Sequence, residues 1–162
     1  MAVPSQIASA AFTYGMNANL LKKSFEGLTT EEWLRRPSDS SNHLLWIVGH
    51  VTWARSVALG FLGGTWTKPW APLFGRGTKL DDSAQYPTPE EMALAWEEVS
   101  AQLAAALEST SEEALSKPGP ERIPSVDGKI SGVVNFLANH ESYHVGQVAY
   151  LRCWMGHDGI AG

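Results

Sequence analysis

The sequence contains a single cysteine, Cys153, among 162 residues. One cysteine excludes an internal disulfide framework and a cysteine-based zinc finger, and it fits a reducing compartment, so we expect a cytoplasmic protein. No apolar run reaches about 18 residues, which is the length needed to cross a bilayer, so no membrane-spanning helix and no membrane partner are expected. Residues 1–10 lack a basic segment followed by an apolar stretch, so no signal peptide is predicted.

Positive charge is also scarce. The 12 Lys and Arg against 17 Asp and Glu give a net charge of −5. A mildly acidic chain lacks the basic surface of a nucleic-acid binder, so DNA and RNA are not expected as partners.

A chain of 162 residues that is 44% apolar is typical of one domain with a sizeable core, and we predict a single domain over residues 1–162. The seven Trp are unusual, and several of them are expected to wall a pocket or an interface.

Four long segments have the 3-4 spacing of apolar residues that is typical of amphipathic helices. They run from about Ser5 to Leu28, from Asn42 to Leu62, from Thr88 to Ala106 and from Ser131 to Met155. The third segment opens with Thr88-Pro89-Glu90-Glu91, a capping box with proline at the first helical position. Apart from residues 123–130, no segment shows the alternation of a strand. The sequence therefore predicts an all-α protein, most simply a four-helix bundle.

The connections between these segments also carry signals. Residues 29–37 and 110–118 have similar sequences, and each predicts a threonine-capped turn of helix that is ended by proline. Common helix-cap chemistry and an ancient duplication explain this similarity equally well. Residues 63–87 form a long, Trp-rich connection, which is interpreted either as a functional loop or as a hydrophobic strap over one end of the bundle. Residues 123–130, with Asp127-Gly128 at their centre, predict a small hairpin.

Three histidines fall on the apolar faces of two predicted helices. His140 and His144 are four residues apart, so their rings lie on one face about 6 Å apart along the helix axis and can reach one metal ion. His50 supplies a third nitrogen if the second and fourth long helices pack together. Taken alone, His50 is explained as a hydrogen-bonded core histidine, and the His140–His144 pair as two helix-face histidines without a metal. The three histidines together favour a metal site. Imidazole ligands suit Zn, Ni, Cu or Fe rather than Ca or Mg, and zinc or nickel is our first expectation.

Other polar and reactive side chains are assigned to simpler roles. His43 is predicted at the surface of its helix or on a pocket rim, because it lies about 10 Å along the axis from the histidine of the apolar stripe. His157 is predicted to be in a solvated tail, and Cys153 is predicted to be a packing residue. Arg55 and Arg152 are interpreted as surface cations, with the binding of an anionic substrate group as the alternative.

The segment His140-Glu141-Ser142-Tyr143-His144 also matches the His-Glu-x-x-His signature, in which the glutamate is the general base of a zinc peptidase. The longer metzincin motif requires glycine and histidine where this chain has Gln147 and Tyr150. No glutamate follows His144 to act as a later third ligand. A metal-dependent hydrolase or peptidase of this type is therefore a minor alternative.

Glu141 is the candidate catalytic residue of this segment. It orients a ligand histidine, acts as a base, or points to a neighbouring helix, and the sequence does not separate these three roles. Tyr143 and Gln147 flank the histidine face. They are interpreted as residues that pack in the core or at an interface, with hydrogen bonding to a ligand as the alternative.

The two histidine segments resemble the two metal motifs of the DinB/YfiT-like family. They read Asn-His-Leu-Leu-Trp-Ile-Val-Gly-His over residues 42–50 and Asn-His-Glu-Ser-Tyr-His-Val-Gly-Gln over residues 139–147, and the later Leu151-Arg152 pair also resembles the family pattern. This resemblance implies an up-down-down-up four-helix bundle, a homodimer, and a divalent metal site. Its ligands would be His50, His140 and His144. The Trp-rich connection departs from typical members.

The resemblance also implies a chemistry. Members of this family include bacillithiol S-transferases and a mycothiol-dependent maleylpyruvate isomerase. We therefore expect a metal-dependent transferase that joins a low-molecular-weight thiol to a small electrophilic substrate, since three protein ligands leave a coordination position open for the thiol. The alternative from another class is a non-catalytic metal-binding stress protein, in which a fourth protein ligand closes the site.

Overall fold

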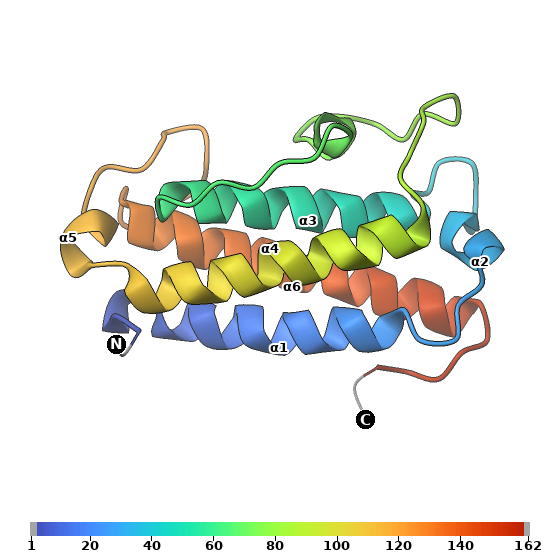
Figure 1. Cartoon of the computed structure of the whole chain (residues 1–162), viewed down its shortest axis with the longest axis horizontal. Helices are drawn as coiled ribbons and strands as arrows, with labels where there is room; N and C mark the ends of the chain where they lie inside the picture. The colour runs from blue at the N-terminus through green and yellow to red at the C-terminus, as the bar shows by residue number, and fades with distance from the viewer. Residues whose placement is uncertain (1–2, 161–162) are drawn as a thin grey trace.

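The computed structural model describes residues 3–160, and its regular structure is helical (Figure 1). The four long helices are α1 (Ala8–Ser24), α3 (Leu44–Phe61), α4 (Pro89–Ser109) and α6 (Ile130–Trp154). The short elements are η1 (Ser5–Ile7), α2 (Thr30–Leu34), η2 (Ala71–Phe74) and α5 (Glu112–Leu115). Within residues 3–160 there is no strand, so the all-α prediction is confirmed.

The long helices are arranged up-down-down-up. Figure 1 shows α1 and α6 running in one direction along the bundle, and α3 and α4 running in the opposite direction. Helix α6 packs against both α1 and α3, while α4 packs against the same two helices on the other side. Because α3 and α4 are parallel, residues 63–87 must carry the chain back along the bundle, which is why this connection is long (Figure 1).

The helix starts follow local capping chemistry. Thr88 accepts a hydrogen bond from the Glu91 backbone N–H, and the Glu91 carboxylate accepts one from Thr88, so the predicted capping box is confirmed. Thr29 begins α2 through the same arrangement. The cap of α5, however, is Ser111 and not Thr110, because Thr110 is used to end α4.

The predicted hairpin over residues 123–130 is wrong. The backbone pairing is instead an isolated antiparallel bridge between Pro118 and Lys129. One oxygen of the Asp127 carboxylate accepts a hydrogen bond from the Lys129 N–H, and the other accepts from the Ser131 hydroxyl. These bonds fix the turn that leads into α6, and they make Asp127-Gly128 a helix-entry turn and not the centre of a hairpin.

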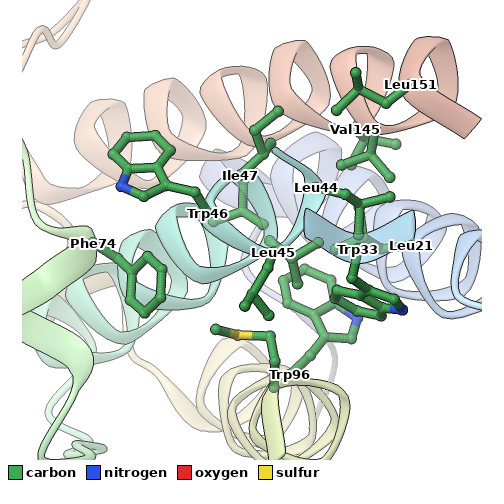
Figure 2. Packing of buried hydrophobic residues seen from close by; sticks show 14 of the residues in the cluster. Leu21, Trp33, Leu44, Leu45, Trp46, Ile47, Phe74, Trp96, Val145 and Leu151 are labelled. Atoms are coloured by element: carbon green, nitrogen blue, oxygen red, sulfur yellow. The ribbon is translucent and has the colours of Figure 1, made fainter. Parts of the chain in front are cut away.

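The core is organised around α3, which is buried on most of its surface. One hydrophobic cluster surrounds the start of this helix and gathers side chains from all four long helices, α2 and η2 (Figure 2). Among its largest members are Trp33, Trp46, Phe74 and Trp96. By length and composition Leu44–Phe61 is apolar enough to cross a membrane, but 72% of these residues are buried inside the bundle. Its apolarity is therefore accounted for by its place in the core.

Candidate metal centre

The three predicted ligand histidines meet between α3 and α6. The Nε2 atom of His140 lies 3.4 Å from Nε2 of His50 and 3.1 Å from Nε2 of His144. One ring nitrogen from each of the three residues lies within 4.8 Å of the other two. His50 is buried, and the other two are half-buried, so the cluster sits at the edge of the core with one side toward solvent.

The spacing of these nitrogens matches that of ligands on one ion. Zn–N bonds of about 2.0–2.1 Å in a tetrahedral site place two ligand nitrogens about 3.3 Å apart. A metal-free cluster is electrostatically incomplete. His140 Nε2 carries at most one proton, so it can donate to only one of the two nitrogens close to it. A bound cation accepts all three nitrogen lone pairs, and the donor set therefore fits a divalent transition metal.

The backbone of η2 fixes the orientation of the His50 ring. His50 Nδ1–H donates to the Phe74 carbonyl oxygen at 2.8 Å, which leaves Nε2 unprotonated and directed at the other histidines. Phe74 reaches this position because its ring lies over Gly49, where a Cβ atom would come within 2.3 Å of a ring carbon. The Trp46 and Trp53 rings stack near the imidazole, with centroids 5.4 Å and 5.8 Å from it.

A side chain on α6 orients the His144 ring. His144 Nδ1–H donates to Gln147 Oε1 at 2.7 Å, and Gln147 Nε2 in turn donates to the Tyr143 hydroxyl at 3.3 Å. Tyr143 is 65% exposed, so it is not a core residue, and its packing at an interface stays a prediction. The three-residue spacing of His144 and Gln147 on a helix was a usable signal for this contact.

The rings are held neutral by burial. The pKa of His140 is lowered to about 4, first by desolvation and then by the neighbouring His144 and His50. Desolvation also lowers the pKa of His50 and of His144. Neutral imidazoles keep the lone pairs that a metal requires. His140 Nδ1 differs from its counterparts, because it is buried without a hydrogen-bond partner among residues 3–160.

Glu141 points to a neighbouring helix, which is one of the three roles that the sequence left open. Both carboxylate oxygens accept hydrogen bonds from Arg55 on α3, at 2.6 Å and 2.8 Å. The two side chains are 1–2% exposed, and the Arg55 guanidinium lies 4.0 Å from the centroid of the Trp96 ring. Burial raises the pKa of Glu141, while the adjacent Arg55 opposes this shift. Both oxygens of Glu141 are thus engaged in the core, and a catalytic role for this residue stays a prediction. The expectation that Arg55 is a surface cation is wrong.

His43 lines a cavity, in agreement with the pocket-rim alternative, whereas Cys153 lies in a different environment from the one expected. His43 is buried and is the N-cap of α3, where its Nδ1 accepts from the Trp46 backbone N–H at 3.0 Å. Sequence reasoning missed this role because histidine is not among the usual N-cap residues. Cys153 is exposed near the end of α6, so its assignment as a packing residue is wrong.

The residues after α6 are tied to α2 and to the end of α1. His157 Nε2 lies 2.8 Å from a carboxylate oxygen of Glu32, so the expectation of a solvated tail is wrong for this side chain. Arg152 donates to three backbone carbonyls, those of Ser24, Glu26 and Asp158. These bonds give Arg152 a structural role.

A cavity of about 340 Å³ opens beside two of the three histidines. It lies against His50 and His140, and its other walls come from α3, α6 and two loops. Trp53 and Phe136 form aromatic walls next to the imidazoles, and the Phe136 ring is stacked on that of His140 with centroids 6.3 Å apart. Its volume is at the lower end of the range for small-molecule sites, about 300–1,000 Å³.

The fold and the histidine cluster together define a class: up-down-down-up helical bundles with a candidate three-histidine metal centre between the second and fourth long helices. Comparison with family models places the chain within this class by sequence as well. The model described as the DinB superfamily matches residues 15–148. The chain therefore belongs to the DinB superfamily, and the matched residues contain all three histidines. A comparison with curated proteins gave no match.

Proposed function

We propose that this protein binds one divalent transition-metal ion through His50, His140 and His144 and transfers a low-molecular-weight thiol to a small electrophile. The observation that carries the proposal is the convergence of three Nε2 atoms, two of them on rings held by Nδ1 hydrogen bonds. An ion held by three imidazoles supplies, when bound, an open coordination position that lowers the pKa of a thiol. Zinc and nickel suit this ligand set.

The surrounding residues supply position and exclude water. Phe74 and Gln147 hold two imidazoles in the tautomer that binds metal. Trp53 and Phe136 offer flat apolar walls against which an electrophile is oriented beside the histidines. The thiol comes from a second substrate, because Cys153 is exposed on α6 about 13 Å along the axis from His144.

The reaction is a nucleophilic substitution with a borrowed nucleophile. With an aryl chloride as acceptor, the thiolate sulfur forms a C–S bond to the ring carbon and the C–Cl bond breaks. Chloride leaves with the bonding electron pair, and the thiol proton goes to solvent. No oxidant or reductant is required.

The structure bears on the two alternatives. A non-catalytic metal-binding stress protein would close its site with a fourth protein ligand, whereas the candidate group found among residues 3–160 has three members. A peptidase would need Glu141 as a base beside the metal, and its carboxylate is paired with Arg55 in the core. Both features favour thiol transfer. The cytoplasmic location and the homodimer stay predictions.

The test is a conjugation assay on metal-loaded protein. It uses 1-chloro-2,4-dinitrobenzene as acceptor and bacillithiol, mycothiol, glutathione or cysteine as the thiol. We expect at least one thiol to be conjugated faster than with metal-free protein, with the gain lost in His140→Ala and kept in His157→Ala. If no thiol is accelerated and none changes the visible spectrum of the cobalt-substituted protein, the metal-binding alternative replaces the proposal.

A further inference from the structure

Apart from these two rings and Arg76, the cavity beside His50 and His140 is lined by nonpolar residues. Helices α3 and α6 contribute aromatic and aliphatic walls, and the loop before α6 contributes a further wall. The walls include Trp53, Val57, Phe136, Leu137, Ile123 and Pro124. Such a surface binds a flat or compact hydrocarbon body, but it offers no hydrogen bond that would choose between related molecules.

One cationic side chain lines this cavity. Apart from the two histidines, Arg76 is the only ionisable side chain among residues 3–160 that lines it. Arg76 belongs to the long 63–87 connection, and its Nη1 donates to the Arg122 carbonyl in the loop before α6. Arg76 is an exposed residue, and this bond links its side chain to the second loop at the cavity.

The charge of Arg76 is not neutralised by a neighbour within the described chain. Residues 3–160 contain no ion pair to Arg76, and the bond to Arg122 is its one hydrogen bond there. A guanidinium carries five N–H donors in a planar fork, so several of them are available to a ligand. A planar fork of this kind matches the two oxygens of a carboxylate.

We infer that the substrate pocket of this protein takes an apolar molecule that carries one anionic group, such as a carboxylate, and that Arg76 receives this group. The inference deepens the proposed function, since it assigns the substrate class of the cavity beside the metal centre. The apolar walls bind the body of the molecule next to the histidines, and the fork of Arg76 fixes its orientation. Arg76 is then a specificity-determining residue supplied by the Trp-rich connection.

The test is a binding measurement that needs no turnover. 3-Nitrobenzoate and 3-nitrobenzamide have nearly the same shape and differ in charge, and neither has a leaving group. Titration calorimetry on metal-loaded protein should give a dissociation constant about tenfold lower for the benzoate, as expected for one charge-assisted contact. In Arg76→Gln this preference should fall to about one, whereas Arg76→Lys should keep part of it. Arg35→Gln is the matched control, because Arg35 lies over the Trp154 ring and does not line the cavity.

The benzoate could also bind more tightly than the benzamide because its carboxylate coordinates the metal directly. Two measurements distinguish this case from binding to Arg76. Direct coordination would change the visible spectrum of cobalt-substituted protein and would leave the preference intact in Arg76→Gln. Either that result or equal binding of the two compounds to the unmodified protein would overturn the inference. The binding measurement contains no thiol. A failure of the conjugation assay alone would therefore overturn the proposed thiol transfer and would leave the assignment of Arg76 unchanged.

Discussion

Replacing Glu141 by glutamine tests whether this residue stabilises the bundle or performs chemistry. The substitution removes the negative charge that faces Arg55, while both side chains stay 1–2% exposed in the native packing. Removing one partner of a buried ion pair costs about 3–5 kcal/mol, and we expect the lower part of this range because glutamine keeps one acceptor oxygen. For a chain of this size, 1 kcal/mol shifts the melting temperature by about 2–4 °C. Glu141→Gln should therefore melt roughly 6–12 °C below the unmodified protein.

The measurement is thermal and urea unfolding of metal-free protein, so that metal binding does not contribute to the stability. Glu113→Gln on the exposed side of α5 is a matched control and should leave the melting temperature within about 1 °C. The double variant Glu141→Leu, Arg55→Met should recover much of the loss, because it removes both buried charges together. Normal stability of Glu141→Gln combined with loss of thiol transfer would show that the carboxylate is catalytic, and the reasoning would be refuted.

Three further substitutions test the supports of the site. Gly49→Ala places a Cβ within 2.3 Å of a Phe74 ring carbon, so it should lower the free energy of unfolding in urea by about 1–3 kcal/mol and weaken metal binding. In the control Gly146→Ala the new Cβ meets nothing within 4 Å, and neither quantity should change. Gln147→Ala removes the acceptor that orients one ligand and should lower metal affinity about 10–100-fold in a competition titration. His43→Ala removes the cap of α3 and should cost about 0.5–2 kcal/mol without changing metal content; a loss of metal there would contradict the ligand assignment.

The parts of the fold that could be predicted from the sequence depend on local patterns. The apolar spacing located all four long helices because a helix buries one stripe of side chains, and Thr88-Pro89-Glu90-Glu91 located a helix start to the residue. His140 and His144 were identified as a pair because four residues return a helix to the same face. His50 joined them once the apolar stripes of its helix and theirs were assumed to pack together.

The remaining features depend on contacts between segments that are distant in sequence. The Phe74 carbonyl that holds His50 lies 24 residues along the chain, and a backbone acceptor leaves no trace in residue type. Arg55 and Glu141 are 86 residues apart, and charged residues on a helix are exposed more often than buried. Arg76 reaches the cavity only because the 63–87 connection runs back along the bundle. The contacts of the Phe74 carbonyl, of the Arg55–Glu141 pair and of Arg76 therefore depend on the tertiary fold and not on local sequence patterns.

Metal stoichiometry is the most direct test of the central claim, which is that His50, His140 and His144 form one metal centre. Metal analysis of natively purified protein, followed by titration of the metal-free form with Co²⁺ or Zn²⁺, should give one ion per chain. The His50→Ala, His140→Ala double variant should lose this ion, while His157→Ala should keep it, because His157 is paired with Glu32 away from the cluster. Full occupancy in the double variant, or an unmodified protein that binds no transition metal, would contradict the account.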